Sequence, residues 1–389
     1  MKNHFDALPE WKEVLADLQA DIKKFYAENK GKTAGKDMPG YDSVELHMWH
    51  IYTGGLRQMN DGKWVASDID LARTLAENAL GTYEWCVDSL NVEGQYGKGA
   101  GKSLFTVLGA MWPRTHKFMT STPLIDTLKK AAEKEGVKLY TEVAAKSLIT
   151  DENGKVVGAN CEKADGTKVT VNTKKGVILT SGGYGANPKM VKEYDNYWGD
   201  NLTDHTLTTN VGTNTGDGIV MAQEIGADIE CMGRFLGMFM SEYGTNYELA
   251  FMHTSTPGIM VNASGDEFGN ITASNHTVLS NAMMDEANGG EFYYIYDDEA
   301  AQKTRDFDAY GFSYQSIFER EATQHYDSVE DAAKALGLDN LKDAIEANNK
   351  YALAGEPNEF GRKICPYIET RDGIWVTRVV PTLYLTTGG

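Results

Sequence analysis

Apolar residues recur every three or four positions in two separate stretches of the chain. The first stretch lies between Pro9 and Asn29 and contains Trp11, Leu15, Leu18, Ile22 and Phe25. The second contains Leu80, Tyr83, Val87 and Leu90. This spacing places the side chains on one face of a helix, so both stretches are predicted to be amphipathic helices. The Lys- and Gly-rich residues 30–40 between them predict a loop.

Further helices are indicated by signals at their ends. Thr122 is suited to cap a helix, Pro123 suits its first turn, and Gly136 ends it. Pro188 begins another helix, and one more follows residues 216–218. Helices are also expected at residues 278–286, 328–336 and 340–353.

The pattern changes to that of strands over residues 138–180. Short β-rich pieces lie around Leu139, 148–149, 156–157 and 169–171. They are separated by residues 151–154 and 165–166, whose Asn-Gly and Asp-Gly pairs suit hairpin turns because these residues tolerate positive φ. The apolar run at 176–180 predicts a buried strand, and residues 374–380 predict another near the end of the chain.

Composition and charge narrow the classes of function. The 389 residues include 37 Lys and Arg against 56 Asp and Glu, so the formal net charge is −19. This acidic balance opposes binding to nucleic acids, whose affinity rests on neutralising phosphates, and to anionic membranes. No apolar run approaches the roughly 18–20 residues that span a bilayer. We therefore expect a soluble chain without a transmembrane segment or a nucleic-acid partner.

Neither metal nor nucleoside triphosphate binding is favoured. The four cysteines are far apart, without a C-x-x-C pair. Residues 97–103 suggest a P-loop, but Tyr96 stands where that loop needs glycine, so a surface loop is favoured. His47 and His50 share a helix face with Glu45, yet a metal site needs three or four ligands held together, and ordinary histidines are the favoured interpretation.

Two glycine-containing segments carry the candidate chemistry. Residues 181–185 (SGGYG) directly follow the predicted buried strand, and their backbone N–H groups could hold the oxygens of a ligand. A tight turn between strand and helix would explain them equally well. In residues 215–218 (TGDG), Asp217 could be part of a ligand site or only a helix cap.

Taken together and in order, these motifs resemble a known family. Residues 177–187 followed by 214–222 resemble the flavoproteins that include fumarate reductases and succinate dehydrogenases. Further matches lie at residues 70–78 with Trp85, 114–116, 145–158, 360–362 and 386–389. The resemblance covers nearly the whole chain from about Tyr41.

The resemblance implies an α/β fold with mixed α+β content and FAD as the cofactor. It would consist of a partial FAD-binding three-layer ββα domain interrupted by an α+β capping domain. The implied boundaries are residues 1–230 for the FAD-binding domain, 231–370 for the capping domain and 371–389 for a strand returning to the first domain. The residues implied to hold FAD are Ala144 and Ala145 at the adenine, Ser181, Gly182 and Gly183 along the cofactor, and Asp217 as a hydrogen-bonding partner.

Two elements of the family are missing from this sequence. The dinucleotide-binding βαβ unit with its G-x-G-x-x-G loop is absent before Tyr41, and the final flavin-binding helix is absent after residue 389. We therefore expect a partial sequence truncated at both ends and inactive by itself. Since no leader could then be seen, the compartment, cytoplasmic or exported, is left open.

The residues expected at the substrate differ from those of a fumarate reductase. The family's proton-donating arginine falls on Asn275, and no arginine lies between Arg234 and Arg305. A dianion needs cationic or bidentate donors, whereas the pocket residues implied here are mostly apolar or aromatic. They are Met238, Phe239, Phe251, Asn275, Tyr384 and Leu385. The expected substrate is thus larger and less charged than fumarate.

Two residues are candidates for the proton donor. His276 has an imidazole that titrates near neutral pH, although a helix-entry histidine bonded to its own backbone is the favoured alternative. Tyr384 is the other candidate, and His253 is a weaker one.

The sequence therefore predicts an FAD-dependent oxidoreductase. It would transfer a hydride from flavin N5 to a carbon–carbon bond conjugated to a carbonyl, or catalyse the reverse desaturation. Its partners would be a small-molecule substrate and an electron donor, as a domain or protein outside this chain, because no haem or iron–sulfur spacing is present. The alternative is a non-catalytic protein of the same fold that has lost FAD and binds a small apolar ligand.

Overall fold

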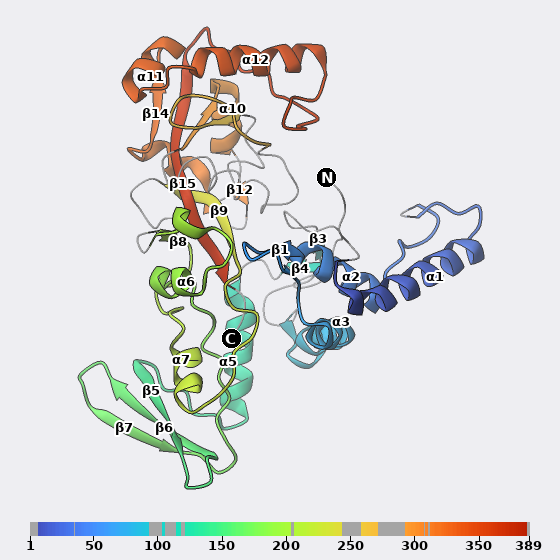
Figure 1. The fold of residues 1–389 in the computed structure, drawn as a ribbon, viewed down its shortest axis with the longest axis vertical. Coiled ribbons are helices and arrows are strands. Elements are labelled where there is room, and N and C mark those ends of the chain that lie inside the picture. The colour runs from blue at the N-terminus through green and yellow to red at the C-terminus, as the bar shows by residue number, and fades with distance from the viewer. Residues whose placement is uncertain are drawn as a thin grey trace. The chain divides into compact units, whose positions relative to one another are not determined.

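The structure, a computed structural model, describes ten parts of the chain. They are residues 7–34, 36–92, 103–105, 114–117, 121–203, 206–242, 258–270, 292–306, 308–309 and 312–386. The chain divides into two compact units, Met1–Leu139 and Tyr140–Gly389 (Figure 1). Within the described residues, no helix is both long enough and apolar enough to cross a membrane.

The first unit is mainly helical. Its helices are α1 (Lys12–Glu28), α2 (Val44–Gly55), α3 (Ile69–Glu84) and α5 (Ser121–Lys134), with a 3₁₀ turn at Pro9–Trp11 and a π turn at Trp85–Ser89. Its short strands form two pairs, β1 (Arg57–Gln58) with β2 (Trp64–Val65) and β3 (Ser103–Phe105) with β4 (Thr115–Lys117). The core contains Trp11 stacked on Tyr52, with ring centroids 4.6 Å apart.

The predicted helices of this unit are confirmed, with one difference in extent. The apolar group that begins at Leu80 lies at the end of α3, which starts eleven residues earlier at Ile69. The signal for that start is Asp68, whose carboxylate accepts hydrogen bonds from the N–H groups of Asp70 and Leu71. An N-terminal cap therefore fixes the helix boundary better than the apolar spacing alone.

The second unit begins with an antiparallel meander. Its strands are β5 (Val143–Thr150), β6 (Val156–Lys163) and β7 (Lys168–Asn172), in the order β5-β6-β7. Both predicted hairpin turns are confirmed, with Gly154 at φ +80° and Gly166 at φ +81°. The β-rich piece at Leu139 is not a strand, because no backbone in the described part of the chain pairs with it and its side chain is exposed.

The buried strand predicted at residues 176–180 is wrong for this structure. The segment is extended, but no described strand pairs with it, and the Ile178 side chain is 88% exposed. A strand is defined by hydrogen bonds to a neighbouring backbone and buries its side chains only under a covering layer. Neither is supplied by the described residues, so the apolar run alone did not make a strand.

Four of the five described helices of the second unit agree with the sequence, and the fifth, α10 (Asp298–Asp306), was not predicted. The four are α6 (Pro188–Tyr194), α7 (Asp217–Glu224), α11 (Val329–Leu336) and α12 (Leu341–Ala354), with 3₁₀ turns at Gly199–Asn201 and Tyr314–Glu319. Asn187 caps α6 by accepting from the N–H of Met190, and Ser328 caps α11 by accepting from that of Asp331. The helix predicted at 278–286 lies outside the described residues.

A six-stranded sheet built on β15 (Ile374–Thr386) organises this unit. Its other strands are β8 (Leu207–Thr208), β9 (Phe235–Glu242), β10 (Ile259–Val261), β11 (Phe292–Tyr296) and β14 (Thr323–Tyr326), while β12 (Asp308–Ala309) and β13 (Phe312–Ser313) form a separate pair. β15 is antiparallel to β9, β11 and β14 and parallel to β8. Figure 1 shows this long strand in red, with the label β15 beside it.

Side chains alternate between the two faces of this sheet. In β11, Phe292, Tyr294 and Tyr296 belong to one buried cluster, whereas Tyr293 and Ile295 belong to another that α11 and α12 help to form. Both faces are therefore covered, which explains why every β11 side chain is buried. The domain boundaries after residues 230 and 370 stay predictions.

Candidate cofactor and substrate site

Residues 181–185, here called the glycine loop, are anchored by Tyr184. This side chain is fully buried among apolar residues, and its hydroxyl accepts a hydrogen bond from the N–H of Gly233 at 3.3 Å. Burial raises the pKa of Tyr184, because the phenolate would lose its hydration. Tyr184 therefore holds the loop in place through its buried, protonated hydroxyl.

One side of the glycine loop packs against other parts of the same unit. A Cβ added to Gly182, which has φ +81°, would lie 2.7 Å from Asn214 Oδ1. A Cβ on Gly183 would lie 2.5 Å from Thr386 Oγ1. Both approaches are closer than a side chain allows, so packing within the protein requires these glycines. The tight-turn interpretation of the motif is correct for this side of the loop.

The other side of the glycine loop is open. Ser181 and Gly182 are exposed, and no described residue accepts a hydrogen bond from the N–H groups of Ser181, Gly182 or Gly183. Ser181 Oγ lies against the first turn of α7, where it would contact a Cβ on Gly218. Consecutive free N–H groups beside a hydroxyl can donate to the oxygens or nitrogens of a ligand.

Asp217 stands at the start of α7. The residue before it, Gly216, has φ +85° and gives the helix no side-chain cap. Thr215 Oγ1 donates to Asp217 Oδ1 at 2.8 Å, and the carboxylate is exposed. A negative charge there is favourable, because the N-terminus of a helix is electropositive. Asp217 is thus oriented by Thr215 and accessible to a ligand.

The remaining cofactor candidates lie on β5, beside α7. Ala144 is opposite Glu162 and Ala145 is opposite Cys161 in the pairing with β6. β5 is an edge strand in the described residues, and Ala144 is exposed. Small side chains on an open edge leave main-chain groups accessible to a flat ring system. Donors, acceptors and small residues therefore adjoin one another here, and this set fits a dinucleotide such as FAD.

The end of β15 brings two substrate candidates next to the glycine loop. Thr386 Oγ1 accepts from the N–H of Tyr184 at 3.2 Å, and the preceding residues are the half-buried Tyr384 and the exposed Leu385. Met238 is opposite Thr382 in the pairing of β9 with β15.

The other candidates for the substrate pocket are not described. Phe239 lies on β9, and its side chain, like that of Met238, is outside the described residues. Phe251, Asn275 and His276 lie wholly outside them, as does His253. Their role stays a prediction.

The sequence analysis missed two residues of this region, Asn210 and Asn214. Asn214 Nδ2 donates to Asn210 Oδ1 at 2.8 Å, and Asn210 Nδ2 donates to the carbonyl of Tyr384 at 3.1 Å. The only signal in the sequence is that the two asparagines are four positions apart and that Asn214 directly precedes the TGDG segment. That spacing alone does not reveal a partner 174 positions away.

His47 and His50 lie beside Arg114 in the first unit. Arg114 Nη1 lies 2.8 Å from His50 Nδ1, and the same guanidinium is paired with Asp42. The pKa values of His47 and His50 are lowered by burial first and by Arg114 second. No cluster of three metal-binding side chains is found among the described residues.

A half-buried carboxyl group, that of Glu267, lies in the second unit next to β10. Burial raises the pKa of Glu267 to about 7, despite the nearby Arg362, and Asn358 Nδ2 donates to Glu267 Oε1 at 3.2 Å. Arg362 is 3% exposed, and its Nη1 donates to the carbonyl of Gly258 at 2.6 Å. These polar groups hold the ends of β10 in place.

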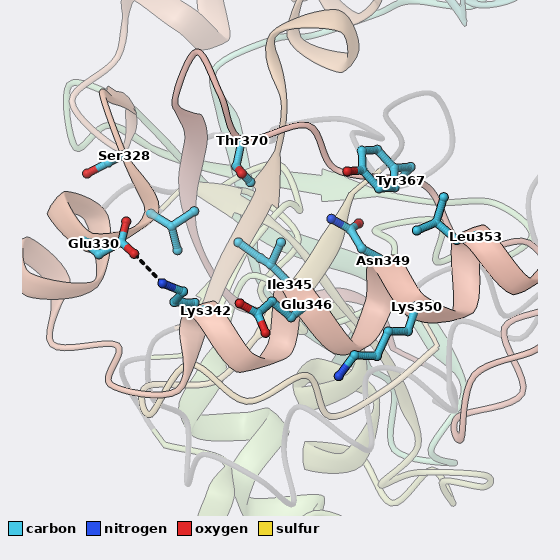
Figure 2. A pocket seen from close by; sticks show the side chains of 11 residues that line it. Ser328, Glu330, Lys342, Ile345, Glu346, Asn349, Lys350, Leu353, Tyr367 and Thr370 are labelled. Atoms are coloured by element: carbon cyan, nitrogen blue, oxygen red, sulfur yellow. Dashed lines mark hydrogen bonds and ion pairs between the residues drawn. The ribbon is translucent and has the colours of Figure 1, made fainter.

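A surface pocket of 430 Å³ lies between α11, α12 and residues 367–370. Figure 2 shows Lys342 paired with Glu330 at 2.8 Å on one side, and Tyr367 near Leu353 on the other. None of the expected cofactor or substrate residues lines this pocket. It is therefore separate from the region around the glycine loop.

The fold and this region indicate a flavin-nucleotide-binding protein. The family model described as "FAD binding domain" matches residues 32–389, and the chain belongs to that family. The expected FAD cofactor and the fold class are confirmed at the level of this family.

Two similar proteins are named as an oxidoreductase and a probable reductase. The chain is 30% identical to the NADH:acrylate oxidoreductase of Vibrio harveyi over 99% of its length and 39% of that protein's. It is 29% identical to a probable fumarate reductase of Shewanella frigidimarina over 90% of its length and 55% of that protein's. The chain thus spans about two fifths to just over half of these relatives.

A solved structure supports the same assignment. The open conformation of a flavocytochrome c3 fumarate reductase superposes with a TM-score of 0.67 at 25% identity. The match covers 90% of this chain and 57% of the other. The resemblance to the fumarate reductase flavoproteins is therefore confirmed.

Proposed function

We propose that this chain is part of an FAD-dependent reductase or dehydrogenase that acts on a carbon–carbon bond conjugated to a carbonyl. Bound FAD supplies the hydride chemistry. The residues proposed to hold it are Ala144, Ala145, Ser181, Gly182, Gly183 and Asp217. The observation that carries the proposal is the set of free N–H groups of the glycine loop, beside the start of α7 and the end of β15.

The proposed substrate carries less charge than fumarate. No arginine or lysine lies among the pocket candidates Met238, Phe239, Phe251, Asn275, Tyr384 and Leu385. Binding a dianion without cationic donors leaves its charge desolvated and unpaired. The names of two relatives, an acrylate oxidoreductase and a urocanate reductase, specify substrates with one carboxylate. The larger size expected from the apolar side chains rests on the pocket alone.

A colour test examines the cofactor assignment. We expect the full-length protein to purify yellow and to release FAD on denaturation. With reduced methyl viologen as electron donor, kcat/KM for acrylate, urocanate or an enone should exceed that for fumarate. A protein that stays colourless after incubation with FAD would instead support the non-catalytic alternative. Faster turnover of fumarate than of every monocarboxylate or enone would contradict the pocket argument.

Tyr384 and His276 are the proposed proton donors. If Tyr384 is the donor, Tyr384→Phe should lower kcat by roughly 10²- to 10⁴-fold, the usual contribution of a general acid, and leave bound FAD unchanged. If His276 is the donor, His276→Gln should have that effect and Tyr384→Phe a much smaller one. The solvent deuterium isotope effect on kcat is then measured for the faster of the two variants. It shows whether proton transfer still limits the rate in that variant.

A further inference from the structure

Asn210 connects the end of β15 to the glycine loop. Its Nδ2 donates to the carbonyl of Tyr384 at 3.1 Å and to Thr208 Oγ1 at 3.0 Å. Thr208 Oγ1 in turn donates to the carbonyl of Gly185 at 2.7 Å. One amide group thus reaches a substrate candidate directly and the glycine loop through a single hydroxyl.

A second connection runs through Asn214. Asn210 Oδ1 accepts from Asn214 Nδ2 at 2.8 Å, and Asn214 Oδ1 lies 2.7 Å from the position that a Cβ of Gly182 would take. Asn210 also lies against Gly185, where a Cβ would come within 2.5 Å of its Nδ2. Both ends of the glycine loop are therefore in contact with this pair of asparagines.

We propose that Asn210 is a positioning residue that fixes Tyr384 relative to the cofactor site. The proposal rests on the function proposed above. Tyr384 and Leu385 can be placed reproducibly against a cofactor on the glycine loop only if the end of β15 is held to that loop. Hydride transfer depends steeply on such placement, and a misplacement of about 1 Å can cost 10²-fold in rate.

The chemistry of this position requires a carboxamide. The Nδ2 of Asn210 donates to Thr208 Oγ1 and to the carbonyls of Leu383 and Tyr384, and its Oδ1 accepts from Asn214. Neither a carboxylate nor a hydroxyl can reproduce this set. Asn210→Asp keeps the shape and the acceptor for Asn214. It removes both donors and sets a carboxylate oxygen against the carbonyl of Tyr384.

Asn349→Asp is a matched control. Asn349 is also half-buried, and its side chain binds both the carbonyl and the N–H of Ile368, at 2.9 and 2.8 Å. It lies on α12, and it lines the pocket of Figure 2. Asn349→Asp removes the side-chain donor to Ile368. It should lower the stability about as much as Asn210→Asp does, without affecting the glycine loop.

The experiment compares Asn210→Asp and Asn349→Asp in the full-length protein. For Asn210→Asp only, we expect amide hydrogen exchange in residues 381–386 to rise about 3- to 10-fold, as for a lost hydrogen bond. The kcat/KM for the fastest of acrylate, fumarate and urocanate should fall about 10- to 100-fold. The FAD dissociation constant should stay within about 3-fold of that of the unmodified protein, since the free N–H groups of the loop are unchanged.

Two results would overturn the proposal. One is equal amide exchange of residues 381–386 in the two variants, because Asn210 would then have no specific role in holding the end of β15. The other is faster exchange without loss of kcat/KM, because the placement of Tyr384 would then not matter. If the unmodified protein binds no FAD, the proposed function fails, while the exchange data still decide whether Asn210 holds β15.

Discussion

Residues 176–180 and strand β11 have similarly apolar sequences and very different surroundings. All five β11 side chains are buried, and the strand pairs with β10 on one side and β15 on the other. Ile178, in the middle of the other segment, is 88% exposed and has no paired strand among the described residues. An apolar sequence thus indicates that a segment would be stabilised by burial. Whether its side chains are in fact buried depends on which other segments pack beside it.

The largest expected effect comes from substituting one isoleucine in each region. Ile295→Ala should lower the free energy of unfolding of this chain by about 2–5 kcal/mol, because Ile295 is fully buried between strands and helices. Ile178→Ala should change it by less than about 0.5 kcal/mol, as for an exposed side chain. Urea denaturation of both variants tests the contrast, and equal losses would mean that residues 176–180 are buried in solution.

The same pair of substitutions in the full-length protein sharpens the contrast. If a covering strand is supplied there, Ile178→Ala should cost several times more than it does in the 389-residue chain. The cost of Ile295→Ala should be the same in both, since its neighbours all belong to this chain.

The next effect concerns Glu267, the half-buried carboxyl group beside β10. Its pKa is about 7 in the folded chain against 4.5 without burial, so the unfolded chain releases this proton first as pH rises. Stability should therefore fall between pH 4.5 and 7 and level off above, by at most about 3 kcal/mol. Glu267→Gln keeps the acceptor for Asn358 and should remove this fall.

Urea midpoints at pH 5 and pH 8 measure that prediction. Glu267→Gln should be clearly more stable than the unmodified chain at pH 8 and close to it at pH 5. If Glu267→Gln stabilised the chain more at pH 5 than at pH 8, the pKa of Glu267 would be lowered in the folded chain. Burial would then not be the dominant cause of the shift.

A third effect tests the packed side of the glycine loop. Gly183→Ala should cost about 1–3 kcal/mol, the usual penalty of overpacking, because the new methyl group meets Thr386 Oγ1. Adding Thr386→Ala should recover part of that loss. Gly212→Ala is the control, since nothing lies within 4 Å of its Cβ position. Thermal unfolding of the three variants decides, and equal costs for the two glycines would contradict the observed packing.

The smallest expected effect is at the exposed pair of the α11–α12 pocket. Lys342 and Glu330 are 59% and 64% exposed, so water and salt screen their attraction. Glu330→Gln should shift the urea midpoint slightly at low salt and not at all at 0.5 M NaCl. A shift as large as that of Ile295→Ala would mean that this pair supports more than a surface contact.

Local signals in the sequence predicted most helices and both hairpin turns. Asp68 was not recognised as a cap, so the start of α3 was placed too late, although its carboxylate is a local signal. The predicted strand at 374–380 was too short, because Pro381 suggests a strand end. In the structure Pro381 lies at a shift of register between β15 and β9, where one less N–H is needed, and the strand continues to Thr386.

The candidate site was predictable where its residues are neighbours in sequence. The glycine loop and Asp217 follow from short motifs, and the structure places Ser181 against the start of α7. The contacts of Asn210 could not be predicted, since they join residues 174 positions apart and depend on where β15 ends. Residues that hold a site together across such distances leave no local pattern.

β15 makes the second unit dependent on its last residues. This strand pairs with β8 and β9 through its final residues and with β11 and β14 through its first. A cut or a premature stop codon before Ile374 would deprive four strands of their common neighbour at once. Shortened products should therefore expose sheet edges prone to aggregation and be degraded, and an affinity tag after Gly389 selects chains in which this strand has been synthesised.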